Sequence, residues 1–291
     1  MNEAGLLRDA CWQWLNAHKS FFDLTRVVPG QGSYQVKACG ELMIILAASI
    51  NRGLEPSEAS SLRAIAHGSI GAYDWQARVI QDVRFVTPML VNIWFLQSIG
   101  EQAHNFIEIV SEQVALGRTK SANVAPHRRL ELRWLLAICG IEPLTKDAFT
   151  SLLSACYCLW MLPHEMTLQD WYAVAHIVFY LTDYGTVDAR TRISVAQFAS
   201  LRERLRLLMT MAIGANEVDV IAELLLSLLF VDALDHRLQR TALASADALL
   251  FGKNGCLASG RPTAQQPVER CYHPALLWAY AAESLKHYGR E

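Results

Sequence analysis

The chain has 291 residues, of which 52% are apolar and 19% are charged, with a formal net charge of −2. This balance excludes global disorder and allows a sizeable buried core. Because no basic run recurs, we expect no nucleic-acid partner. The most apolar run, "LLLSLLFVDALDH", is too short to span a bilayer, so we expect no membrane partner either.

The N-terminal sequence "MNEAGLLRDA" contains acidic residues where a secretory signal would need a cationic start and an apolar run. The seven cysteines are an odd number scattered through apolar patterns, which is typical of reduced thiols. We therefore expect a cytoplasmic protein. Cys156 and Cys158 are two residues apart and point to different sides of a helix, so we interpret them as core cysteines.

Apolar residues recur at three- and four-residue spacing along nearly the whole chain. Clear examples are "GELMIILAASIN", "PMLVNIWFLQSIG", "RLELRWLLAICG" and "VIAELLLSLLFV". No segment shows sustained alternation, so no β-sheet is predicted. Gly53, Gly100, Gly140 and Gly185 fall where left-handed C-terminal caps are expected.

These units predict an all-α protein of about twelve helices in antiparallel hairpins, forming a single domain over residues 1–291. The helices around "WYAVAHIVFYLTDYG" and "VIAELLLSLLFV" are apolar on all sides and must be enclosed by others. Enclosed helices favour an α/α toroid over an open helical solenoid.

Two longer irregular segments interrupt the pattern, at residues 24–35 and 252–272. Loops of this length in a helical domain tend to be lids or binding loops, so residues 252–272 are a candidate lid. The last helix is then expected to open with Pro274 in its first turn, where proline is tolerated.

Polar residues inside the apolar stretch Trp171–Gly185 mark the first candidate site. His176, Tyr180 and Asp183 share one helix face, and His176 and Asp183 are about 10 Å apart along the axis. They could therefore act on a shared ligand. A carboxylate is disfavoured at a helix C-terminus, so Asp183 needs another reason to be there. The alternative is structural, with His176 a hydrogen-bonded core residue and Thr186 or Asp188 capping the next helix.

A second candidate lies in "FVDALDHRLQR". Asp232, Asp235 and His236 would converge if the helix were continuous, which suits a divalent metal or a proton-transfer pair. A metal would need further ligands, and His176, Asp183 or His67 could supply them. The predicted metal set is therefore His176, Asp183, Asp232 and His236. Alternatively, Asp232 or Asp235 is the N-cap of a helix beginning "HRLQRTALASADALL".

The segment "ERCYHP" offers a weaker pair, in which Cys271 and His273 could act as thiolate and base or as ligands. No dinucleotide fingerprint, Walker loop or zincin motif is present.

The segment "AHIVFYLTDYG", together with "DALDHRLQ", resembles a family of bacterial helical proteins with a signature close to "HVVFYLTDFG". Some of its members are encoded near specialised-metabolite genes. The resemblance directs attention to six positions: His176, Phe179, Tyr180, Thr182, Asp183 and Gly185. A looser likeness links the predicted toroid to lanthionine cyclases, but "CYHP" departs from their Cys-His-Gly zinc element.

Two functions remain open. In the first, a helical pocket binds or modifies a small molecule or peptide in a bacterial specialised-metabolite pathway. His176 and His236 would be acid–base groups or metal ligands, Tyr180 would donate a hydrogen bond, and Asp183 and Asp232 would orient or coordinate. In the second, the protein is a non-catalytic helical scaffold for a protein partner.

Overall fold

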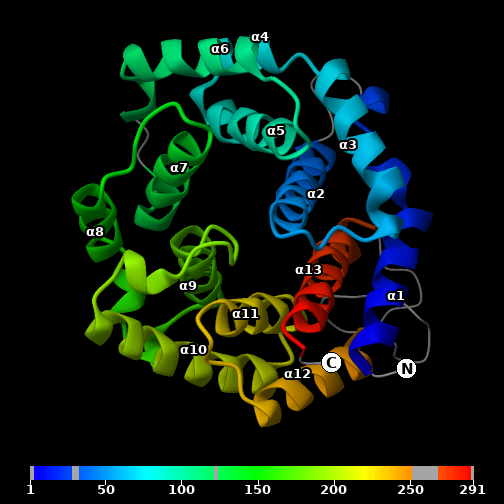
Figure 1. Ribbon diagram of the computed structural model, residues 1–291, viewed down its shortest axis with the longest axis vertical. Coiled ribbons are helices and arrows are strands. Elements are labelled where there is room, and N and C mark those ends of the chain that lie inside the picture. The colour runs from blue at the N-terminus through cyan, green and yellow to red at the C-terminus, as the bar shows by residue number, and fades with distance from the viewer. Residues whose placement is uncertain (1–2, 28–32, 121–123, 251–267, 290–291) are drawn as a thin grey trace. The chain divides into compact units, whose positions relative to one another are not determined.

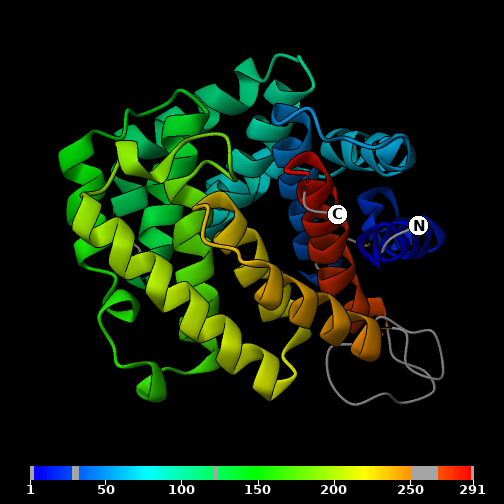
Figure 2. The same cartoon turned by 60° about the horizontal axis from the view of Figure 1, so that its bottom comes forward.

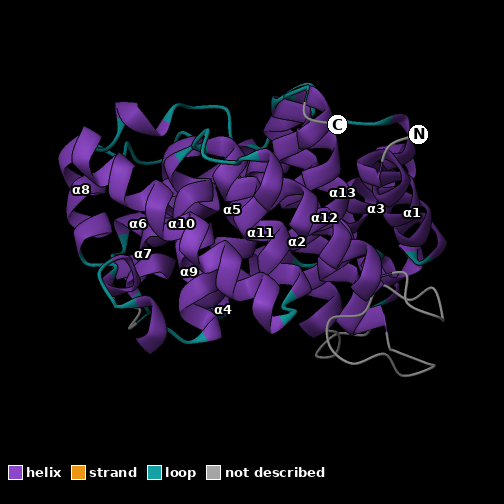
Figure 3. Cartoon of the chain, turned by 90° about the horizontal axis from the view of Figure 1, so that it is seen from below, coloured by secondary structure: helices purple, strands orange, loops and turns teal. Residues whose placement is uncertain are grey.

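The computed structural model describes residues 3–27, 33–120, 124–250 and 268–289. Thirteen α-helices and several short 3-10 helices account for the regular structure of these residues, and they contain no strand (Figure 3). The all-α prediction is therefore confirmed. Within these ranges, no helix combines the length and apolar character needed to cross a membrane.

The chain divides into two compact units. Unit 1 comprises residues 1–17 and 153–291, and unit 2 comprises residues 18–152. The single domain over residues 1–291 and its α/α-toroid arrangement remain predictions.

One largely buried helix lies among the helices of unit 2. Its helices are α2 (Ser33–Asn51), α3 (Ser60–Ala72), α4 (Trp75–Gln81), α5 (Val86–Ser98), α6 (His104–Ala115), α7 (Pro126–Ile138) and α8 (Lys146–Ser154), the last of which ends at the unit boundary. Helix α5 is enclosed because every residue from Met89 to Leu96 is buried and all of these except Asn92 are apolar, and it packs against α2, α6 and α7. Burial of these side chains from water stabilises the unit.

Unit 1 joins the N-terminal helix to the second half of the chain. Its helices are α1 (Glu3–Ala17), α9 (Leu168–Leu181), α10 (Val195–Ala215), α11 (Val218–Phe230), α12 (His236–Leu250) and α13 (Val268–His287). Helix α11 lies between α9 and α13, with α10 and α12 also packed against it (Figure 1). Helix α1 packs mainly against α13 (Figure 2).

The glycines predicted from the sequence to end helices do so in the structure. Gly53, Gly100, Gly140 and Gly185 all have positive φ, as their predicted C-cap role requires. The prediction that two apolar helices are enclosed is also confirmed, because every residue from Val220 to Phe230 in α11 and ten of the fourteen residues of α9 are buried.

The start of the last helix was predicted wrongly. Helix α13 begins at Val268, so Pro274 lies inside it rather than in its first turn. Proline costs an interior helix one backbone hydrogen bond. Cys271 and Tyr272, which precede it in the helix, are both buried. Residues 268–272 of the predicted loop are thus helical, while residues 251–267 lie outside the described residues.

Candidate functional site

Helix α9 supplies the first histidine of the site. Thr167 and Asp170 form a capping box that begins the helix: the Thr167 backbone N–H donates to Asp170 Oδ2 at 2.8 Å, and the Asp170 N–H donates to Thr167 Oγ1. Ten of the fourteen residues of α9 are buried. His176 is one of the exceptions, and its side chain is 25% exposed.

Helix α11 supplies a glutamate from the centre of unit 1. Glu223 is 1% exposed, although its neighbours in the helix are almost all apolar. One turn later, Ser227 Oγ donates to the Glu223 backbone carbonyl at 2.8 Å. The same hydroxyl lies 3.5 Å from the carbonyl of Ala175 in α9, which ties the two helices together next to His176.

Helix α13 supplies the second histidine, His273. The helix is fixed against its neighbours by two buried hydrogen bonds. Trp278 Nε1 donates to the Val218 carbonyl at 3.1 Å, and the Tyr280 hydroxyl donates to the Tyr184 carbonyl at 3.0 Å. These bonds set the register of α13 beside α11 and so place His273 opposite Glu223.

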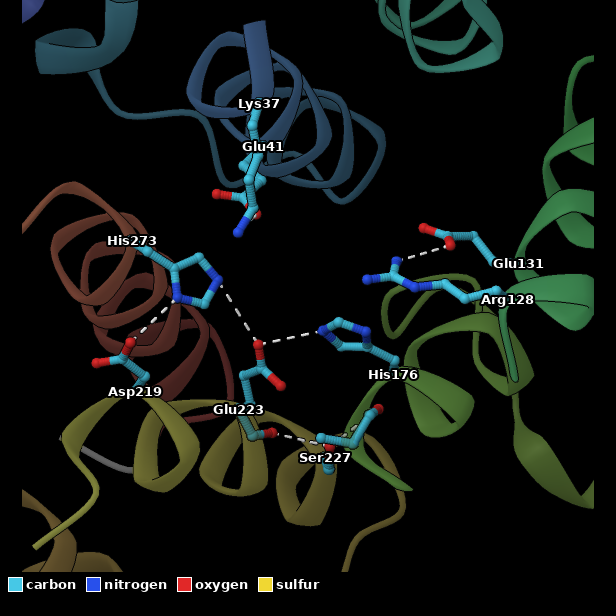
Figure 4. A network of polar contacts seen from close by, with 10 residues as sticks. Lys37, Glu41, Arg128, Glu131, His176, Asp219, Glu223, Ser227 and His273 are labelled. Carbon is cyan, nitrogen blue, oxygen red and sulfur yellow. Dashed lines mark hydrogen bonds and ion pairs between the residues drawn. The ribbon is translucent and has the colours of Figure 1, made fainter. Parts of the chain in front are cut away.

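The three helices bring two imidazoles and two carboxylates together (Figure 4). Glu223 Oε1 lies 3.2 Å from His176 Nε2 and 3.7 Å from His273 Nε2. His273 Nδ1 lies 3.4 Å from Asp219 Oδ2. Asp219 and Glu223 are four residues apart on α11 and share one face of it. We call His176, Asp219, Glu223 and His273 the Glu223 cluster.

One oxygen of each carboxylate remains unused. Asp219 Oδ1 and Glu223 Oε2 are buried without a hydrogen-bond partner among the described residues. An unsatisfied buried polar group costs about 1–3 kcal/mol, and more when it is charged. Such a group needs an explanation, which can be a catalytic role or a bound water or ion.

Tyr172 lies one turn before His176 on α9, and its ring is 6.4 Å from that imidazole between centroids. Burial raises the pKa of the Tyr172 hydroxyl, and the charges of Asp219, Glu223 and Glu217 raise it further, as does a hydrogen bond to Asp219. The hydroxyl therefore stays protonated at neutral pH and faces a negatively charged environment.

The predicted site residues on α9 separate into two groups. Tyr180 is buried, with its ring 6.3 Å from the His176 ring, so the predicted proximity of this pair is confirmed. Asp183 lies beyond the helix end and forms a two-pronged ion pair with Arg192, at 2.6 and 2.7 Å. Arg192 also donates to the carbonyls of Tyr180 and Leu181, the last of the helix. The positive charge of Arg192 thus explains why the Asp183 carboxylate is tolerated at the C-terminus of α9.

The continuous helix on which a convergence of Asp232, Asp235 and His236 depended does not form. Helix α11 ends at Phe230, Asp232 has a positive φ of 49°, and α12 begins at His236. Asp235 caps α12 by accepting from the Leu238 N–H at 2.9 Å, as the alternative interpretation expected. Asp232 and His236 are exposed.

The four predicted metal ligands are not gathered into one group. His176 faces Glu223 and Asp183 faces Arg192, while His236 is exposed at the start of α12. Across the described parts of the chain, no group of three or more His, Cys, Asp or Glu side chains is arranged to hold a metal ion.

Asp232 instead lines a cavity of about 260 Å³ at the C-terminal ends of α9 and α11. The guanidinium groups of Arg190 and Arg202 lie over the ring of Phe198 in its wall, at 5.8 and 5.6 Å from the ring centroid. Gly185 also lines it, with φ of 88°; a Cβ there would lie 2.6 Å from the Phe230 ring. Only glycine fits that position without rearrangement.

Sequence reasoning missed Glu223, Asp219 and Tyr172. A signal for the first two existed, because they are acidic residues one turn apart in an otherwise apolar helix. His273 was considered only together with Cys271, which is buried.

The comparisons with known proteins show the family. Residues 8–282 match the model of DUF6895, a domain of unknown function. The chain belongs to the DUF6895 family. No curated protein and no solved structure matches it. The match covers both units, so the Glu223 cluster lies within the DUF6895 region.

Proposed function

We propose that unit 1 binds a small molecule and transfers a proton to or from it at the Glu223 cluster. The observation that carries this proposal is a glutamate, 1% exposed, whose Oε1 is shared by two imidazoles and whose Oε2 has no partner among the described residues. Clustered titratable groups that share a buried charge are typical of catalytic sites.

His176 is the proposed acid–base group. With Glu223 accepting from its Nε2–H, the neutral ring leaves Nδ1 as a proton acceptor. That nitrogen has no hydrogen-bond partner within the described ranges, and the side chain is 25% exposed. A carboxylate that orients an imidazole in this way is the arrangement used by many general bases.

His273 and Asp219 hold the other side of the cluster. Both His273 nitrogens face a carboxylate oxygen, and both can donate only when the ring is an imidazolium. In this proposal, His273 supplies a positive charge that stabilises buried Glu223, and Tyr172 donates a hydrogen bond from its protonated hydroxyl.

The pathway is a further part of the proposal. The likeness of "HIVFYLTDYG" to the family signature, in which His176 comes first, supports a role in bacterial specialised metabolism. The seven scattered cysteines support a cytoplasmic location. A metal ion is not needed for this chemistry and is not part of the proposal.

Metabolite profiling tests the proposal. Purified protein is incubated with a bacterial metabolite extract, and masses that change with time are compared among variants. We expect conversion by the wild-type chain and by Glu203→Gln, which removes an exposed carboxylate of unit 1. Conversion should fall about a hundredfold or more in His176→Gln and Glu223→Gln. No conversion by the wild-type chain, or equal conversion by all variants, would contradict proton-transfer catalysis.

A second candidate, the protein-binding scaffold, is favoured by one observation. Tyr157, Trp160 and Leu162 lie within six residues of each other and are 54%, 56% and 55% exposed. Neighbouring exposed apolar side chains mark many interaction sites. A partner chain that co-purifies with the wild-type protein, but not with the double variant Trp160→Ser, Leu162→Ser, would support this function. An unchanged set of co-purifying proteins would contradict it.

A further inference from the structure

A cavity in unit 1 lies apart from the Glu223 cluster, at the C-terminal ends of α9 and α11. Its volume is about 260 Å³, and all the residues that line it belong to unit 1. Gly185, where the apolar stretch Trp171–Gly185 ends, forms part of its wall after α9, and Phe230 forms part of it at the end of α11. Phe230 is seven residues beyond Glu223, which is about 10 Å along the helix. The chemistry proposed for Glu223 therefore leaves this cavity without a role.

The backbone beside this cavity is strained. Asp183, Tyr184 and Gly185 have successive φ values of 44°, 54° and 88°, and Asp232, in the wall after α11, has a φ of 49°. Residues other than glycine rarely adopt such values, and those that do are concentrated at ligand-binding and active sites. The strain therefore points to a functional use of the cavity.

The wall of the cavity contains a guanidinium group that is bonded to a carbonyl rather than to a carboxylate. Arg202 Nη2 donates to the backbone carbonyl of Asp232 at 2.5 Å. Arg202 Nε is buried and has no acceptor in the described part of the chain. A charged donor left without an acceptor is costly, so Arg202 favours a ligand that brings an anionic oxygen.

The other charges of the wall limit the charge of that ligand. Arg190 and Asp188 pair with each other, since Arg190 Nε lies 3.0 and 2.9 Å from the two Asp188 oxygens and Arg190 Nη2 lies 2.7 Å from one of them. Asp232 adds a second carboxylate to the wall. A doubly charged anion would be repelled by these two carboxylates, whereas a single carboxylate group needs only the charge of Arg202 to balance it.

The remaining wall is largely apolar and includes an aromatic ring that contacts both guanidinium groups. Phe230 and Val231 line the cavity together with Phe198. The guanidinium carbons of Arg202 and Arg190 lie 5.6 and 5.8 Å from the centroid of the Phe198 ring. These cation–π contacts hold each guanidinium beside the ring. An anion bound to Arg202 therefore lies next to apolar side chains, which favours a ligand with an apolar body.

We propose that this cavity binds a small organic monocarboxylate with an aromatic body. Its carboxylate accepts hydrogen bonds from the Arg202 guanidinium, and its body packs against Phe198 and Phe230. A planar guanidinium matches the geometry of a carboxylate, which is why arginine is common at carboxylate-binding sites. The inference is independent of proton transfer at Glu223, because it uses no residue of the Glu223 cluster.

Four small molecules separate the elements of this recognition. Benzoate has both the carboxylate and the ring, benzamide has the ring without the charge, phenyl phosphate carries about two negative charges at pH 8, and acetate lacks the ring. We expect benzoate to bind the full-length protein saturably in a ligand-observed NMR titration at that pH. Benzamide, phenyl phosphate and acetate should each bind about tenfold more weakly or worse, because each lacks one feature that the wall recognises.

Two arginines on α10 provide a matched pair of variants. Arg202 and Arg206 are one helical turn apart, and both donate to backbone carbonyls of the segment after α11, at Asp232 and Ala233. Of the two arginines, only Arg202 belongs to the cavity wall. We expect Arg202→Gln to weaken benzoate binding about tenfold or more, and Arg206→Gln, which loosens the same segment, to leave it unchanged.

If Arg202→Gln does not fold, Arg202→Lys replaces it. Lysine keeps the positive charge but lacks the planar pair of donors, so benzoate binding should weaken about threefold or more. Four results would each overturn the inference: no binding of benzoate, equally tight binding of any of the other three molecules, wild-type affinity in the Arg202 variant, or an equal loss in Arg206→Gln. A loss of benzoate affinity in Glu223→Gln but not in Arg202→Gln would also overturn it, because the anion would then be bound at the Glu223 cluster.

Discussion

At the residue scale, the buried side chains differ in whether their polar atoms find hydrogen-bond partners. The Glu223 carboxylate is buried and only one of its oxygens has partners, whereas the six cysteines in the described part of the chain are buried free thiols. Burial raises the pKa of Cys39, Cys139 and Cys158 to about 12 and that of Cys156 to about 11, and it raises the pKa of Cys11 further still.

Thiol labelling checks this difference. A thiol with a pKa near 11 is ionised in only about one molecule in a thousand at pH 8, and the thiolate is the reactive form. We predict that a Cys256→Ser variant, which leaves only the six described cysteines, reacts slowly with Ellman's reagent at pH 8. All six should react at once in guanidinium chloride. Rapid stoichiometric reaction of the native protein would contradict the burial of these side chains.

Single residues were predictable where the signal lies in the chain itself. His176 stands out as the imidazole in an apolar helix, and Cys156 and Cys158 were correctly assigned to the core. The partnership of His176 with Glu223 was not predictable, because it depends on how α9 and α11 pack. The two residues are 47 positions apart, and spacing within a helix carries no information about such pairs.

Helix ends are the most informative feature at the element scale. Thr167 and Asp170 begin α9, and Arg192 and Asp183 complete its C-terminus. Such signals are local, so most elements and the positive-φ glycines could be predicted. The break between α11 and α12 could not be told from a continuous helix by residue spacing, because Asp232 and His236 fit either reading.

The Asp183–Arg192 pair should stabilise the end of α9. We predict that Asp183→Asn and Arg192→Gln each lower the free energy of unfolding by about 1–3 kcal/mol, because either change leaves a partly buried group without its charged partner. In a double-mutant cycle measured by urea denaturation, the two effects should be non-additive by about 1 kcal/mol or more. Simple additivity would mean that the ion pair contributes nothing.

Gly185 provides a second test at this scale. Gly185→Ala places a side chain on a residue with positive φ and against the Phe230 ring. We therefore predict that it lowers the free energy of unfolding by about 2–4 kcal/mol. Gly214→Ala is the matched control, since this glycine lies inside α10 with open space around its Cβ position. It should be neutral or stabilising by about 0.5–1 kcal/mol in thermal denaturation. Equal effects of the two changes would contradict the close contact at Gly185.

Residues far apart in the chain meet at the scale of the whole molecule. Unit 1 joins residues 1–17 to residues 153–291, and its α1 packs on α13, so its core is complete only when both ends of the chain are present. Helix periodicity predicts an apolar face on α1 but not the helix it covers. The division into two units was not predicted either.

The contribution of α1 can be measured with two substitutions in that helix. Trp12 is 1% exposed, so Trp12→Ala should lower the free energy of unfolding by about 3–5 kcal/mol. Leu6 is 51% exposed, and Leu6→Ala should change it by about 0.5 kcal/mol or less. Denaturation followed by circular dichroism distinguishes the two. A small effect at Trp12 would mean that α1 is dispensable to unit 1.

The sharing of one buried carboxylate by two histidines is tested most directly by nitrogen-15 NMR of the histidine rings in the full-length protein. The signals of His176 and His273 are assigned from their loss in His176→Gln and His273→Gln. We predict that Glu223→Gln shifts the ring-nitrogen signals of both histidines and that Glu203→Gln shifts neither. If Glu223→Gln leaves both signals in place, or moves only one, Glu223 does not link the two rings.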